Sequence, residues 1–169
     1  MIGCTSGSRS DYEDGSYKAV REEERLKEGF HGAVDLAKTS QGGEVDLEKL
    51  SKVAACFRST RSRLKREPSI RSSLSHLPAN IISEDGFLKE LHETGAFSGG
   101  LKFQKREMPE GFFKKFEGIV KKHGKDFADY LTGKFSQGIK DLKEQHQKNL
   151  AVLNKELEKA LVLRDFVNS

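Results

Sequence analysis

The stretch from Asp126 to Val167 reads DFADYLTGKFSQGIKDLKEQHQKNLAVLNKELEKALVLRDFV, and its apolar residues decide the expected fold. From Ala128 onward, the stripe falls at positions 131, 135, 139, 142, 146, 150, 153, 157 and 161. The steps of three and four repeat every eleven residues, about 3.67 residues per turn, which predicts a nearly straight stripe on one helix. If unbroken, this helix spans roughly 60 Å, so it either packs antiparallel on its neighbours or projects and self-associates.

We expect this stripe to contact a protein partner or a second copy of the chain, as in a coiled coil. The predicted partner-binding residues are Leu142, His146, Leu150, Leu153, Leu157 and Leu161. A polar residue such as His146 can set the register of an apolar seam, or it can lie half solvated at the edge of that seam. The sequence favours the edge position and leaves both open.

Helical periodicity upstream predicts an all-α protein, a helical bundle with a long C-terminal helix and a disordered N-terminal tail. We divide the chain into a tail at 1–16, a helical region at 17–94, a linker at 95–107, and an amphipathic helix plus the long helix at 108–169. The tail is small, polar and glycine-rich, which is typical of disordered termini.

Within the helical region, the first helix is expected over 17–38, with a solvated, charged first half around Glu22 and Glu23. A second helix begins after Asp46, a favourable N-cap, and ends near Arg66, because Pro68 cannot continue it. We expect 67–80, a polar stretch rich in Ser, to form a loop before a short helix capped by Ser83. A further helix begins at Pro109, and Gly124 either ends or weakens it.

Charge is unevenly distributed along a chain whose net charge is only +4. Residues 49–76 carry a balance of +7 and residues 101–125 a balance of +5, which leaves −8 for the rest. Such basic segments suit phosphate or an anionic membrane surface. They suit the acidic segments of the same chain equally well.

The first basic segment interleaves Arg with Ser and ends in Arg66-Glu67-Pro68-Ser69. We predict lipid or phosphate contact by Arg58, Arg61, Arg63, Lys65 and Arg66. Ser69 is a candidate phosphosite, because Arg66 lies three residues before it and phosphorylation would weaken anion contacts. A solvated helix end followed by a loop explains the same residues as well.

The second basic segment places phenylalanines on one helical face beside lysines. An in-plane membrane helix has this pattern, and so does a core helix whose lysines extend to solvent. The predicted contact residues are Phe112, Phe113, Lys114, Lys115, Phe116, Lys121 and Lys122, and the sequence favours the core helix.

The run Lys115-Phe116-Glu117-Gly118-Ile119-Val120-Lys121-Lys122-His123, followed by Phe127, resembles part of the kinetoplastid membrane protein family. The resemblance is confined to this one helix. It implies a helical protein that associates with membranes, and it assigns no residue roles.

The sequence holds no motif for catalysis, metal binding or a nucleotide phosphate loop. Its five histidines and two cysteines lie outside metal-ligand spacings. We therefore expect a non-enzymatic protein without cofactor or metal. Cys4 and Cys56 fall in a predicted tail and a predicted helix, so we expect no disulfide and a reducing compartment.

These observations predict a helical interaction or scaffold protein that binds a protein partner or self-associates. The first alternative is a peripheral membrane protein, and the second is a nucleic-acid-binding protein. No apolar run approaches the ~20 residues needed to span a bilayer. The predicted location is the cytoplasm, with the membrane surface as the alternative place.

Overall fold

The computed structural model describes residues 15–40, 46–94, 111–142 and 147–169. These residues form seven helices and no strand, which confirms the all-α prediction. Residues 1–14 of the predicted tail, the whole predicted linker at 95–107, Pro109, Cys4 and His146 lie outside the described residues, whereas residues 15 and 16 belong to the first helix.

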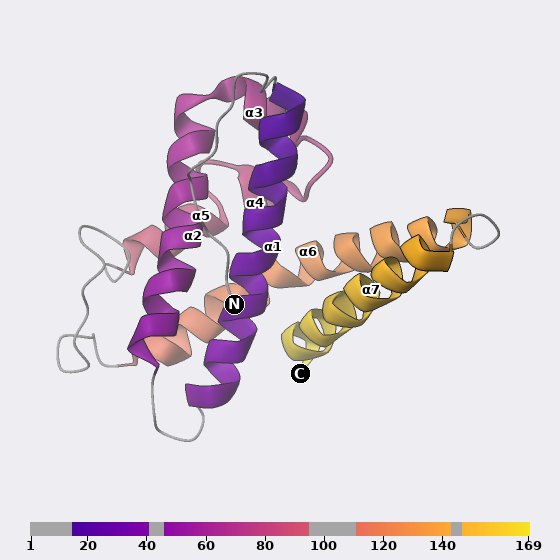
Figure 1. The fold of residues 1–169 in the computed structure, drawn as a ribbon. Coiled ribbons are helices and arrows are strands. Elements are labelled where there is room, and N and C mark those ends of the chain that lie inside the picture. The colour runs from indigo at the N-terminus through magenta and orange to yellow at the C-terminus, as the bar shows by residue number, and fades with distance from the viewer. Residues whose placement is uncertain (1–14, 41–45, 95–110, 143–146) are drawn as a thin grey trace.

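Helices α1 (Gly15–Ser40) and α2 (Leu47–Arg66) form an antiparallel pair, as Figure 1 shows. The start of α2 confirms the predicted cap, because the Asp46 carboxylate accepts a 3.0 Å hydrogen bond from the Lys49 amide. The helix ends at Arg66, two residues before Pro68, as predicted. These two boundaries depend on local chemistry and are therefore readable from the sequence.

The segment expected as a loop at 67–80 is largely helical. Helix α3 (Pro68–Ser73) begins with Pro68 in its first turn, and α4 (Ala79–Ile82) follows. The prediction gave too little weight to three apolar residues in this polar stretch, Ile70, Leu74 and Leu77, which are all buried. Their burial holds the segment against α1 and α2.

Helix α5 (Phe87–Glu93) begins after Gly86 rather than directly after Ser83. A Cβ atom at position 86 would lie 2.1 Å from the Asn80 carbonyl oxygen, so only glycine fits this approach. The tight passage aims Phe87 into the core.

Four phenylalanines from four helices meet at the centre of the body: Phe30 of α1, Phe57 of α2, Phe87 of α5 and Phe127 of α6. Their ring centroids lie 4.7 to 5.6 Å apart around Phe30 and 5.0 Å apart between Phe57 and Phe87. Aromatic pairs in this range stabilise a core beyond their buried area. This cluster fixes α6 across the α1–α2 pair.

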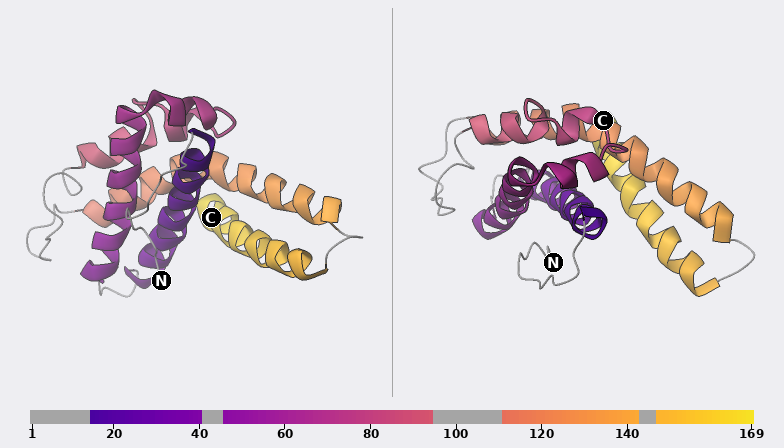
Figure 2. Two further views of the ribbon diagram at one scale, coloured as in Figure 1. Left: turned by 45° about the horizontal axis from the view of Figure 1, so that its top comes forward. Right: turned by 90° about the horizontal axis from the view of Figure 1, so that it is seen from above.

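Helix α6 (Phe112–Leu142) runs through Gly124 without interruption, and α7 (Gln147–Asn168) returns along it. The apolar stripe is therefore divided between two antiparallel helices, and the choice that the sequence left open is decided in favour of folding back. Figures 1 and 2 show this hairpin leaving the body, while the C-terminal end of α7 comes back toward α1.

Candidate interaction surfaces

The far end of the α6–α7 hairpin projects beyond the body, and we call residues 136–142 with 147–158 the arm (Figure 2). The arm meets the body at Lys27 of α1, whose ammonium lies 2.9 Å from Glu156 and over the ring of Phe135. Beyond this junction, the described arm residues contact one another: Leu153 of α7 packs at Gly138 of α6, and Gln137 donates a hydrogen bond to Asp141 within α6.

The described stripe leucines, Leu142, Leu150, Leu153, Leu157 and Leu161, are all half buried. Leu153 packs closely on α6, where a Cβ at Gly138 would lie 3.2 Å from its methyl group. On the outer side, Val152 is 61% exposed. Two helices alone cannot enclose such a stripe, so the arm presents a partly covered apolar surface.

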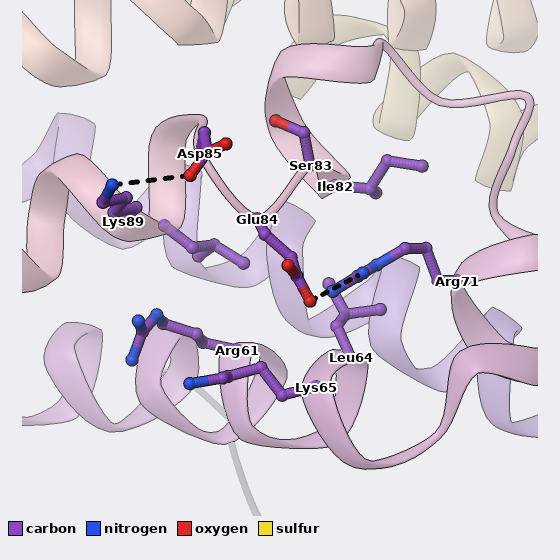
Figure 3. A pocket seen from close by; sticks show the side chains of 10 residues that line it. Arg61, Leu64, Lys65, Arg71, Ile82, Ser83, Glu84, Asp85 and Lys89 are labelled. Atoms are coloured by element: carbon purple, nitrogen blue, oxygen red, sulfur yellow. Dashed lines mark hydrogen bonds and ion pairs between the residues drawn. The ribbon is translucent and has the colours of Figure 1, made fainter.

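A second surface is a hollow of about 190 Å³ between α2 and the α4–α5 segment, drawn in Figure 3 and called the basic pocket here. Its cations are Arg61, Lys65, Arg71 and Lys89, and its carboxylates are Glu84 and Asp85. Leu64, Ile82 and Leu88 supply its apolar wall, and Ser83 supplies a hydroxyl group.

Two of the four cations in the basic pocket are paired. Arg71 lies 3.2 Å from Glu84 and Lys89 lies 3.4 Å from Asp85, as the dashed lines in Figure 3 show. Arg61 and Lys65 have no ion pair or hydrogen bond to a side chain of the described residues. They lie one turn apart on α2, so both reach the same space.

The other predicted residues of the first basic segment lie elsewhere. Arg63 turns inward and lies 3.3 Å from Glu22 of α1, while Arg66 and Ser69 are exposed and Arg58 is half buried. The structure thus brings Arg61 and Lys65 together with Arg71 and Lys89, which sequence reasoning missed. Arg71 could have been noticed in the sequence, because it is the one arginine of residues 67–80, but that stretch was wrongly expected to be a loop.

The Phe-rich start of α6 faces inward. Phe112 and Phe116 are buried, Phe113 is half buried, and Lys114 and Lys115 are exposed. Lys121 and Lys122 pair with Glu117 and Glu90, respectively. A lipid contact through these rings would need α6 to leave the core.

The first half of α1, expected as a solvated surface, is mostly buried, which corrects that expectation. Glu22 pairs with buried Arg25 and with Arg63, whereas Glu23 binds Lys134 at 2.7 Å and accepts a hydrogen bond from the Tyr130 hydroxyl at 3.1 Å. Periodicity along α1 could not reveal this, because the covering groups come from α2 and α6.

Burial and pairing shift the carboxyl pKa values in opposite directions at neighbouring positions. Burial raises the pKa of Glu22, and the nearby Arg25 and Arg63 offset only part of this effect. Burial would also raise the pKa of Glu23, but hydrogen bonds with Lys134, His76 and Tyr130 lower it below the usual value. Burial, together with the neighbouring Glu23 carboxylate, raises the pKa of the Tyr130 phenol.

Another polar contact joins α5 to α6. Glu90 contacts the buried His123, whose other ring nitrogen lies 2.9 Å from the Asn80 amide nitrogen. Burial opposes ionisation of Glu90, yet hydrogen bonds from His123 and Lys122 lower its pKa. This arrangement satisfies a buried histidine and needs no ligand to explain it.

The state of Cys56 also differs from the prediction. The sequence favoured a reduced structural cysteine, whereas the buried Cys56 is disulfide-bonded in the structure. The other cysteine of the chain, Cys4, lies outside the described residues. Disulfides are rare in reducing compartments, so cysteine usage no longer favours one.

Within the described ranges, no group of three His, Cys, Asp or Glu side chains is placed to hold a metal ion. In the same part of the chain, no helix is long and apolar enough to cross a bilayer. Comparison of the chain with protein-family models, with curated proteins and with solved structures found no match.

Proposed function

We propose that this protein is a non-catalytic interaction protein that self-associates through its arm. The proposal rests on the half-buried leucine row of α7, which, among the described residues, is covered along the arm mainly by α6. Two such hairpins, packed about a two-fold axis, would form a four-helix bundle and enclose both rows.

The balanced charge of the arm supports a second copy of the chain as its binding partner. Its described segments hold three lysines, Lys140, Lys148 and Lys155, and three carboxylates, Asp141, Glu156 and Glu158. Because these charges cancel, two identical arms can approach without net repulsion.

The test compares one exposed arm residue with a matched residue on the body. Val152→Glu places a charge on the arm at a position that is 61% exposed, and Val20→Glu makes the same change on α1 at 59% exposure. Light scattering coupled to size exclusion should give the wild type and Val20→Glu masses above the 18.9 kDa of one chain. Val152→Glu should run as a monomer, because self-association would bury its charge unpaired.

A wild-type mass of 18.9 kDa at every concentration tested would exclude self-association. Equal loss of mass in both variants would place the interface away from the arm. If the wild type is a monomer, the arm becomes a surface for a different protein, which immobilised chain could then capture.

The alternatives have weaker support. Membrane binding through the Phe-rich helix is disfavoured by the burial of Phe112 and Phe116. Nucleic-acid binding would use a continuous row of cations, whereas Arg63 is turned onto Glu22. A cytoplasmic location remains a prediction from the sequence, and the disulfide at Cys56 weighs against it.

A further inference from the structure

We propose that the basic pocket binds a phosphate monoester. This inference is independent of the arm, which lies on a different part of the molecule. The pocket joins residues from α2, α3 and the α4–α5 segment into one hollow, and only the folded chain brings them together (Figure 3).

The charge balance of the pocket matches this ligand. Four cations and two carboxylates line it, which leaves a charge of +2. A phosphate monoester carries roughly −1.5 to −2 at pH 7. A ligand of this charge would neutralise the pocket, whereas a carboxylate or a phosphodiester would leave part of the charge uncompensated.

Arg61 and Lys65 supply the site's unpaired donors. Like charges four residues apart on a helix repel each other and destabilise it, and no carboxylate of the described residues pairs with either of them. A bound phosphate would convert this repulsion into two charge-assisted hydrogen bonds. The pair is therefore poorly explained as a purely structural feature.

Arg71 can add a third contact. It holds Glu84 by one nitrogen at 3.2 Å, and the Glu84 side chain is 63% exposed, so this ion pair contributes little. Its Nε atom has no hydrogen-bond partner among the described residues. A small rotation would let the planar guanidinium exchange Glu84 for a phosphate, which it binds in bidentate fashion.

The volume of the basic pocket limits the size of the group that carries the phosphate. At about 190 Å³, the pocket is smaller than the roughly 300–1,000 Å³ of sites that enclose a drug-sized molecule. Its apolar wall of Leu64, Ile82 and Leu88 lies beside the cations. A phosphate on a small or outward-pointing body fits, from either a soluble ester or a lipid headgroup.

The first experiment titrates the full chain with inorganic phosphate at constant ionic strength, kept by chloride, and follows amide NMR shifts. Arg61→Gln with Lys65→Gln is the test variant. Lys114→Gln with Lys115→Gln removes the same charge from exposed positions of α6 and is the control.

We expect saturable shifts at α2 and at residues 83–89 in the wild type and the control. The test variant should bind at least about tenfold more weakly, since it loses two charge-assisted contacts. Equal weakening in both double variants, or no saturable binding in the wild type, would overturn the proposal. If the test variant fails to fold, Lys65→Gln alone, at an exposed position, gives the same comparison with a smaller loss.

Vesicles distinguish the source of the phosphate. Phosphatidic acid carries a monoester and phosphatidylserine a diester, and both are compared in phosphatidylcholine at equal surface charge. Co-sedimentation with phosphatidic acid alone, lost in the test variant, would identify a lipid headgroup. Phosphate binding without a preference between the vesicles would identify a soluble ester.

Discussion

Glu22 is a charged side chain that the fold surrounds almost completely, with an exposed fraction of 1%. Its partner Arg25 is 5% exposed, so both ions have lost most of their water. Burial raises the pKa of Glu22 despite two neighbouring arginines, which means that pairing does not fully offset the cost of desolvation. We infer that the contact between Glu22 and Arg63 of α2 serves to position α1 against α2 more than to stabilise the fold.

Glu22→Gln should lower the free energy of unfolding by about 3 kcal/mol, because it leaves Arg25 as a buried charge without its carboxylate. Replacing both residues, as Glu22→Leu with Arg25→Met, should recover most of this loss. Urea denaturation measures both, with Glu48→Gln of an exposed surface pair as the control, expected to change by less than about 0.5 kcal/mol. A loss in the double variant equal to or larger than that of Glu22→Gln would contradict this account.

At the scale of single elements, α6 carries glycines whose surroundings differ sharply from those of Gly29 on α1. A Cβ at Gly133 would meet nothing within 4 Å, whereas a Cβ at Gly29 would lie 2.7 Å from the ring of Phe57. Phe57 belongs to the central aromatic cluster and cannot move away easily. The same substitution should therefore have opposite effects at the two positions.

Gly133→Ala should raise the free energy of unfolding by about 0.5–1 kcal/mol, because alanine favours an exposed helix interior over glycine. Gly29→Ala should lower it by roughly 1–3 kcal/mol through overpacking. Thermal unfolding followed by circular dichroism measures both. Stabilisation by both variants would show that the α1–α2 contact is looser than the structure indicates.

Comparison of the helices with the predicted ones shows which features of the fold can be read from local sequence patterns. Asp46 and Pro68 mark the ends of α2, because capping and the missing proline amide act within one turn of helix. Gly124 does not end α6, which continues through it. Glycine serves packing at this position, because a Cβ atom there would lie 3.2 Å from the side chains of Phe30 and Val167. The sequence predicts lipid or phosphate contact for Arg61 and Lys65, which stays a prediction, whereas Arg71 and Lys89 join them in one pocket only through the turn of the chain between α2 and α5.

At the scale of the whole molecule, three carboxylates connect helices that are distant in sequence. Glu23 joins α1 to α6, Glu90 joins α5 to α6, and Glu156 joins α7 to α1. Burial would raise the pKa of all three, yet hydrogen bonds with Lys134, His123 and Lys27, respectively, lower it. A folded pKa below the unfolded one means that the stabilisation is complete above the unfolded value and is lost as pH falls through the folded value.

The stability of the fold should therefore fall as pH drops below about 4.5, the ordinary value for these groups. The pKa of Glu22 is raised, so its protonation at low pH favours the folded state. Glu22 therefore makes the fall in stability with decreasing pH less steep, but the three carboxylates outweigh it. Urea midpoints at a series of pH values measure the effect, and Glu23→Gln should show a shallower dependence than Glu48→Gln. A midpoint that stays constant well below pH 4.5 would contradict the prediction.

The helical class of this protein, both ends of α2 and the apolar stripe of the C-terminal third could be predicted from the sequence, because periodicity and capping are properties of neighbouring residues. The folded chain was needed to show that the stripe folds back as a hairpin, that Glu22 and Glu23 are buried, and that four cations from separate segments line one pocket. The physical reason is that burial and charge pairing depend on the element packed opposite. A residue's neighbours along the chain do not record which element that is.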